Sequence, residues 1–173
     1  MTAYVALLRG VNLVGKSSLK MADLKTIAEG LGLRNARTYI ASGNLIFSSD
    51  KSEEKLRRML EKELQLHMAK DVRVMLRTVG EMEAVLGANP FRGVRGNNVQ
   101  AFFMNEAPPK DLLETARSKA DDECIAAGVR EVYVAYGEKG IGRSRLRIPA
   151  AETGTARNMN TVAKLAALAR ELA

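Results

Sequence analysis

Residues 10–17 read Gly-Val-Asn-Leu-Val-Gly-Lys-Ser, which satisfies the phosphate-loop pattern G-x-x-x-x-G-K-[ST]. In a phosphate loop, backbone N–H groups and the lysine hold nucleotide phosphates at the start of a helix. The apolar residues 4–8 directly before the pattern predict the strand that such a loop follows. The first hypothesis for this chain is therefore binding of a nucleoside triphosphate.

The surrounding sequence argues against a nucleotide hydrolase. Apolar residues at helical spacing begin only at Met21, whereas a phosphate loop needs a helix that starts at its Gly-Lys-Ser corner. None of the later predicted strands ends in the Asp that would hold magnesium. We expect a glycine-shaped loop with Lys16 available to an anion, rather than an ATPase or GTPase.

Few other residues could do chemistry. One histidine and one cysteine cannot form a usual zinc site, so we expect no metal, and the sequence identifies no catalytic residue and no cofactor. His67 lies late in an amphipathic segment, where a structural role at a helix end is expected. Cys124 is interpreted as a small core residue on a helix.

The basic residues indicate a function more clearly than the nucleophiles do, because they could bind an anion. Arg143, Arg145 and Arg147 alternate with apolar or small residues on a predicted strand at 142–148, which would place three guanidinium groups on one face. That face could bind phosphate or an RNA backbone, or it could be a charged edge strand that protects the sheet. A second anion site is predicted at the start of the last helix, with Thr155 as the cap and Arg157 in the first turn.

The composition bounds the class of protein. The chain has 173 residues, 46% of them hydrophobic, and a net charge of +7, so it can form one large domain or two small ones. Residues 139–173 hold seven basic and two acidic residues, and this asymmetry fits an anionic partner. The alternative is a basic surface without a partner.

We expect a cytoplasmic protein with no membrane partner. No apolar run is long enough to span a bilayer, and the N-terminus lacks the layout of a secretion signal. The single cysteine excludes an internal disulfide framework, in agreement with a reducing compartment.

The order of predicted elements indicates an α+β fold. Strand, helix, a hairpin with strands 38–41 and 45–48, a helix from Ser52 and a strand at 71–76 follow the ferredoxin-like (split βαβ) order. A short helix at 79–86 leads to a loop at 87–98 that is rich in glycine. Beyond it we predict a strand at 99–104, a helix at 109–127, strands at 129–136 and 142–148, and a helix at 157–172. The prediction is two ferredoxin-like halves in tandem, residues 1–86 and 99–173, joined by the loop 87–98, with the second half lacking its last strand.

Several ordered motifs resemble a known family. They are Leu8-Arg9-Gly10 with Asn12 and Gly15-Lys16, Thr38-Tyr39 with Ser42-Gly43-Asn44, Asn89-Pro90-Phe91, Gly142-Arg143-Ser144, and Thr155-Ala-Arg157-Asn158-Met-Asn-Thr161. Together they resemble the bacterial family catalogued as domain of unknown function 1697, over essentially the full length.

The resemblance implies a two-part α+β fold related to ferredoxin-like units. It points to the motif residues as candidates for a site, but it implies no reaction, because the family has no established activity. Family members usually have Gly-Gly-Lys-Asn where this chain has Val14-Gly15-Lys16-Ser17, so the phosphate-loop match depends on a serine that the family does not require. The usual aromatic residue of the last motif is Met159 here, which argues against a stacking role at that position.

Because the motif residues fall in loops and at strand ends, we expect loops of both halves to form one cleft that binds a phosphate-bearing small molecule or nucleic acid. Three alternatives stay open: an enzyme acting on a phosphorylated substrate, with Lys16 and Arg157 as electrostatic stabilisers; a non-catalytic protein-interaction module; and a purely structural role for the same polar residues. The sequence does not predict the oligomeric state. The candidate ligand-binding residues are Arg9, Gly10, Asn12, Gly15, Lys16, Ser42, Gly43, Asn44, Asn89, Arg143, Arg145, Arg157, Asn158 and Thr161.

Overall fold

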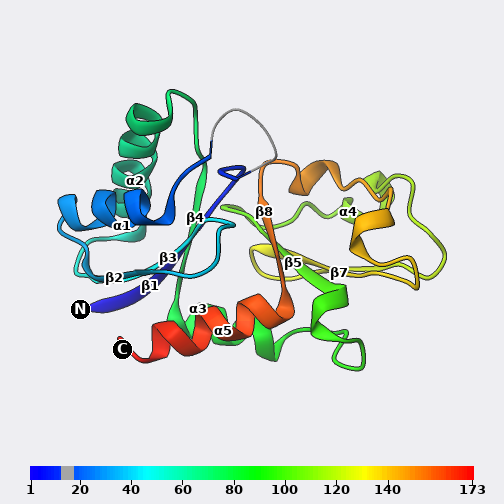
Figure 1. Cartoon of the computed structure of the whole chain (residues 1–173). Helices are drawn as coiled ribbons and strands as arrows, with labels where there is room; N and C mark the ends of the chain where they lie inside the picture. Colours follow the sequence, from blue (N-terminus) through cyan, green and yellow to red (C-terminus); the bar gives the residue numbers. More distant parts are fainter. Residues whose placement is uncertain (13–17) are drawn as a thin grey trace. The chain divides into compact units, whose positions relative to one another are not determined.

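The computed structural model describes residues 1–12 and 18–173 and divides the chain into two compact units. The first unit contains Met1–Glu83 and Lys164–Ala173, and the second contains Ala84–Ala163. Each unit is built on one four-stranded antiparallel sheet, and the described residues form five α-helices in all (Figure 1). This arrangement confirms the predicted α+β class.

The sheet of the first unit has the strand order β2-β3-β1-β4, and every neighbouring pair is antiparallel. Its elements are β1 (Thr2–Leu8), α1 (Met21–Gly30), β2 (Arg34–Thr38), β3 (Asn44–Ser49), α2 (Glu53–Met68) and β4 (Val74–Thr78), with α3 (Val79–Gly87) directly after β4.

The helix starts follow from the local sequence. The Ser52 hydroxyl caps α2 by accepting a hydrogen bond from the Lys55 N–H at 3.4 Å, as the sequence predicts. Helix α1 begins at Met21, and its N-cap residue, Lys20, makes no side-chain cap. The late start of α1 is therefore confirmed, and residues 18–20 separate the end of the phosphate-loop pattern from the helix.

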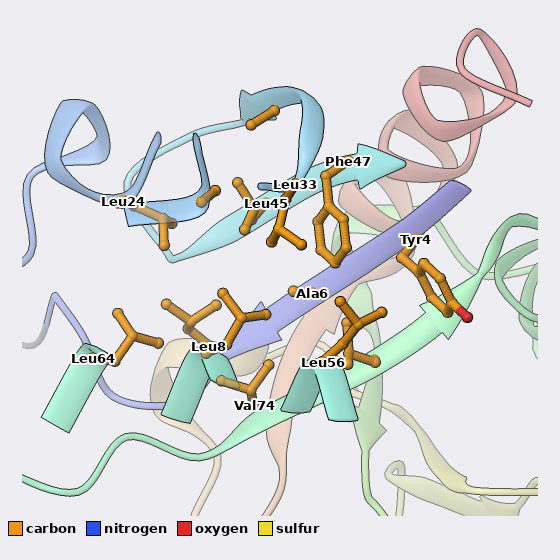
Figure 2. Close-up of a cluster of buried hydrophobic side chains, with 14 of the residues drawn as sticks. Tyr4, Ala6, Leu8, Leu24, Leu33, Leu45, Phe47, Leu56, Leu64 and Val74 are labelled. Carbon is orange, nitrogen blue, oxygen red and sulfur yellow. The ribbon is translucent and has the colours of Figure 1, made fainter. Parts of the chain in front are cut away.

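Helices α1 and α2 cover one face of this sheet (Figure 2). The rings of Tyr4 and Phe47 stack there with centroids 5.8 Å apart, beside leucines from both helices. Side chains at alternate positions of a strand point to the same face, so Tyr4, Ala6 and Leu8 of β1 all enter this core.

Strands β2 and β3 form the predicted hairpin, but β2 lies four residues earlier than the predicted strand 38–41. Residues 39–43 form the turn instead, with Ile40 at φ 50° and Gly43 at φ 86°. The pairing of β2 with β3 ends at Thr38, opposite Leu45, and the positive φ of Ile40 and of Gly43 belongs to the turn.

The second unit repeats the strand arrangement of the first. The order is β6-β7-β5-β8 and all pairs are antiparallel. The elements are β5 (Val99–Phe103), α4 (Leu112–Thr115), β6 (Cys124–Ala127), β7 (Glu131–Ala135), β8 (Thr155–Asn158) and α5 (Met159–Arg170), with three short 3₁₀ turns at Gly96–Asn98, Ile141–Arg143 and Pro149–Ala151.

The predicted helix at 109–127 is wrong. Only α4 is helical, and the backbone becomes extended at Ala116 and left-handed at Ser118, where φ is 56°. The apolar residues 124–127 then pair with β7 as an edge strand. A helix and a paired strand both satisfy backbone groups, so the pairing with β7 and the packing of Ile125 against the hydrophobic cluster of the second unit decide this segment.

The predicted strand at 142–148 is also wrong. A 3₁₀ turn occupies Ile141–Arg143, and the segment makes only an isolated bridge between Arg147 and Arg117. The three arginines 143, 145 and 147 therefore do not share the face of a strand.

The second half does contain its last strand, contrary to the prediction. Residues 155–158, expected at the start of the final helix, pair with β5 as β8, and α5 begins only at Met159. Arg157 consequently lies on a strand rather than in the first turn of a helix.

The end of the chain belongs to the first unit, whereas the sequence analysis assigned residues 99–173 to one half. The Arg170 Nε atom donates to Glu83 at 2.8 Å, and the Arg37 guanidinium lies 2.7 Å from the Glu171 carboxylate. The chain thus leaves the first unit after Glu83 and returns to it at Lys164.

Candidate functional site

The loop that follows β1 contains Arg9 and Gly10, and both are held by the residues before β4. The Arg9 N–H donates to the carbonyl oxygen of Arg73 at 3.0 Å, and the Lys70 ammonium donates to the carbonyl oxygen of Gly10 at 3.1 Å. Gly10 has φ 66°, a left-handed conformation that glycine adopts without strain. The loop is fixed by its backbone, and the Arg9 side chain is exposed.

Both ends of the Asn12 side-chain amide are used within the first unit. Its Nδ2 atom donates to the carbonyl oxygen of Ala41, and its Oδ1 atom accepts from the N–H of Leu19 at 3.0 Å. The next two candidates, Gly15 and Lys16, lie outside the residues that the structure describes.

Asn44 is fully buried and ties the hairpin turn together. Its Nδ2 atom donates to the carbonyl oxygen of Tyr39 and to the Ser42 hydroxyl, both at 2.9 Å. A Cβ atom on Gly43 would lie 2.6 Å from Cγ2 of Val11, so the loop after β1 packs directly on the turn. The structure therefore brings the described motif residues of the first unit together, and the Asn12 and Asn44 amides bond to backbone atoms of the loop after β1 and of the hairpin turn.

Asn89 and Asn158 also act on nearby backbone. The side-chain Oδ1 atom of Asn89 accepts a hydrogen bond from the backbone N–H of Phe91 at 2.9 Å, which fixes the Asn-Pro turn after α3. The side-chain Oδ1 atom of Asn158 accepts a hydrogen bond from the backbone N–H of Thr161 at 2.9 Å and so caps the start of α5.

Arg157 is buried on β8 with only 6% of its surface exposed. Its Nη1 atom donates to the Thr155 hydroxyl at 2.7 Å and to the Ala156 carbonyl at 2.8 Å. Burial lowers the pKa of the Arg157 guanidinium to about 10, because the charged form loses its hydration. The group is still protonated at neutral pH, and it is held inside the protein.

The candidates Arg143 and Arg145 line a pocket of about 440 Å³ in the second unit. We call it the basic pocket. Three of its lining side chains are cationic, Lys139, Arg143 and Arg145, and all three are exposed. Within the described part of the chain, no hydrogen bond or ion pair engages these three side chains. The basic pocket is lined by Ser118, Ala120, Asp122, Glu123, Gly137, Lys139, Gly140, Arg143, Ser144 and Arg145.

The two carboxylates of the basic pocket are already bonded to the protein. The buried Glu123 carboxylate accepts from the Ala120 N–H at 2.8 Å and from the Ser144 hydroxyl. The Asp122 carboxylate accepts from the Glu138 N–H at 3.0 Å. The bonds from Glu138 to Asp122 and from Ser144 to Glu123 tie the 118–123 segment to the 137–145 segment.

Backbone geometry fixes the same pocket wall. A Cβ atom on Gly137 would lie 1.8 Å from Oδ2 of Asp122, so only a glycine allows that carboxylate to approach. Gly140 has φ 68° and lets the chain turn between Lys139 and the 3₁₀ turn at Ile141–Arg143.

Lys139 and Asp122 are site residues that the sequence analysis missed. The spacing Gly137-Glu-Lys-Gly140 marks a tight turn, and this signal could have placed Lys139 beside Arg143. Asp122 and Glu123 carried no such signal, because the segment was interpreted as a helix.

No group of three or more His, Cys, Asp or Glu side chains in residues 1–12 and 18–173 could hold a metal ion. His67, in the last turn of α2, lies 3.5 Å from the Asp23 carboxylate, in agreement with a structural role at a helix end. Among the same residues, no helix is both long and apolar enough to cross a bilayer.

Comparisons with known proteins agree with the motifs. The structure of the chain is similar to that of the conserved bacterial protein SP0830 from Streptococcus pneumoniae, with a TM-score of 0.78 and 25% sequence identity. The match covers 98% of this chain and 99% of that one. No curated protein matches. Residues 1–133 match the family described as "Protein of unknown function (DUF1697)", so the chain belongs to this family.

Proposed function

We propose that the basic pocket of the second unit binds the phosphate group of a small molecule. The observation that carries the proposal is the set of three cations, Lys139, Arg143 and Arg145, which line one pocket without a partner among the described residues. Both carboxylates in the pocket wall accept hydrogen bonds from the protein, and among the described residues neither forms an ion pair with these cations.

Phosphate fits this chemistry better than a neutral ligand. A guanidinium group presents paired N–H donors that match phosphate oxygens, and a lysine adds a point charge. The volume of about 440 Å³ lies within the range of about 300–1,000 Å³ that small-molecule pockets have in proteins.

Isothermal titration calorimetry with ribose 5-phosphate tests the proposal. We expect saturable binding that weakens about tenfold or more in the double variant Arg143→Gln and Arg145→Gln, because charge-assisted hydrogen bonds to phosphate are lost. Lys110→Gln is the matched control, since Lys110 is an exposed cation of the same unit outside the pocket. Binding that is equal in the wild type and the double variant would refute the proposal.

The terminal phosphate of an oligonucleotide carries the same chemistry, so a short 5′-phosphorylated single strand is a second probe. The proposal predicts that ribose 5-phosphate competes with it for the pocket. Tight, strongly salt-dependent binding of the strand without its 5′-phosphate would instead indicate backbone recognition of nucleic acid.

We also propose that each unit is a ferredoxin-like repeat and that the protein is cytoplasmic. The matching strand orders β2-β3-β1-β4 and β6-β7-β5-β8 support the repeat. Two buried arginines at matching positions also support the repeat, Arg77 of β4 and Arg157 of β8. In each, the Nη1 atom donates a hydrogen bond to the carbonyl oxygen of the preceding residue at 2.8 Å. The exposed free thiol of Cys124 supports a reducing compartment.

A further inference from the structure

A second, smaller pocket lies directly beyond the basic pocket along the chain. Its volume is about 190 Å³, and we call it the aromatic pocket. It is lined by Phe102, Tyr136, Leu146, Arg147, Ile148, Ala151 and Glu152.

One short stretch of chain forms a wall of both pockets. Residues 143–145 line the basic pocket, and residues 146–148 line the aromatic pocket. The Cα atoms of the consecutive residues Arg145 and Leu146 are about 3.8 Å apart. The two pockets therefore border each other along this stretch of chain.

The aromatic pocket offers mainly carbon surface. Phe102 is half-buried, and with Leu146 it packs on the hydrophobic cluster that contains Tyr136 and Ile148. The Tyr136 hydroxyl donates to Oε1 of Gln100 at 2.8 Å, and burial, with a smaller effect of the nearby Glu123 charge, raises its pKa to about 12. This hydroxyl is thus protonated and used within the protein, so the ring is what Tyr136 offers to a ligand.

Two charged residues of opposite sign also line the aromatic pocket. Arg147 and Glu152 are both exposed, and no hydrogen bond or ion pair engages their side chains among the described residues. A flat ring with a polar edge matches this combination of aromatic surface, donors and acceptors. At about 190 Å³ the aromatic pocket falls below the usual size of an independent ligand pocket, which fits a subsite.

We propose that the ligand of the basic pocket is a mononucleotide, a phosphate ester whose flat, polar-edged ring occupies the aromatic pocket. This inference rests on the proposed function, since it identifies what the phosphate is attached to. Stacking of a base on an aromatic side chain strengthens binding, so the ring should add affinity that a sugar phosphate lacks.

Calorimetry with adenosine 5′-monophosphate and ribose 5-phosphate tests the assignment. We expect the nucleotide to bind about 5- to 100-fold more tightly. Phe102→Leu should reduce this advantage while leaving the affinity for ribose 5-phosphate unchanged, which also shows that the variant is folded. Glu152→Gln, an exposed substitution, should lower only the affinity for the nucleotide.

The failures of the two proposals are distinguishable. Equal affinities for the two ligands in the wild type, with binding lost in the double variant of Arg143 and Arg145, would overturn the nucleotide assignment and leave phosphate binding intact. A nucleotide advantage that Phe102→Leu does not reduce would also overturn the assignment. No binding of either ligand would refute phosphate binding, and the assignment with it.

Discussion

Glycine and asparagine determine the conformation of the loops that carry most of the family motifs. Gly43 combines φ 86° with close packing on Leu8 and Val11, and the buried Asn44 amide replaces water as the partner of the turn carbonyl at Tyr39. A buried amide without such a partner would cost about 1–3 kcal/mol. Gly43 and Asn44, which could suggest a binding site, thus have a structural role in this turn.

Gly43→Ala should destabilise the first unit by about 2–4 kcal/mol, since it adds left-handed strain to a forced contact with the core. The new Cβ would lie 2.6 Å from Val11 Cγ2 and 3.0 Å from Leu8 Cβ. Gly80→Ala is the control: it lies in α3 with nothing within 4 Å of the new atom, and should stabilise by about 0.5–1 kcal/mol. Urea unfolding monitored by circular dichroism measures both changes, and equal stabilities would contradict this account of the turn.

At the scale of elements, pairing decides the segments whose local pattern is ambiguous. The four residues of β6 are small or apolar and would suit a helix, yet they pair with β7 in a register that sets Cys124 opposite Ala135. A strand of four residues buries little apolar surface by itself. It forms because its backbone N–H and C=O groups hydrogen-bond to those of a neighbouring strand.

The single native cysteine provides a test of this register. Directly opposed residues in an antiparallel pair have Cα atoms about 4.5–5.5 Å apart, within disulfide reach. Ala135→Cys should therefore form a disulfide with Cys124 under mild oxidation, measured as loss of free thiols in the monomer.

Val99→Cys is the matched control. Val99 is the partner of Ala135 on β5, so it lies two strands, about 9–10 Å, from Cys124 and should not crosslink. Crosslinking of Val99→Cys, or none in Ala135→Cys, would show that residues 124–127 are not paired as described.

At the scale of the whole molecule, the C-terminal residues Lys164–Ala173 form part of the first unit. Leu165 and Ala169 of α5 are completely buried, whereas the ion pairs of Arg170 with Glu83 and of Glu171 with Arg37 lie at the surface. Exposed ion pairs contribute little, so the buried apolar residues should supply most of the stability that this segment gives.

Leu165→Ala should lower the free energy of unfolding by about 2–5 kcal/mol, because it leaves a cavity in a packed region. Glu171→Gln, which removes only a surface ion pair, should cost less than about 1 kcal/mol. Denaturant unfolding compares the two variants. A larger loss from Glu171→Gln than from Leu165→Ala would mean that the terminal segment is held by charge rather than by burial.

Local sequence alone determined the elements with strong, self-contained signals. The serine cap and apolar stripe of α2, the spacing that starts α1 at Met21, the strand β5 and the helix α3 could all be predicted, because their periodicity and caps act within a few residues. Arg143 and Arg145, which line the basic pocket, were proposed as candidates from sequence on the basis of a strand that does not exist.

Tertiary structure decided the rest. Residues 155–158 became a strand because β5, distant in the sequence, satisfied their backbone groups, and Arg157 was buried as a result. Residues 124–127 became a strand by pairing with β7 across the short turn at 128–130. The basic pocket joins residues 118–123 to 137–145 through Asp122 and Glu123, and no local pattern encodes that approach. The sequence by itself thus determined the α+β class and the excess of cations in residues 139–173, whereas contacts between the 118–123 and 137–145 segments determined which of these cations line one pocket.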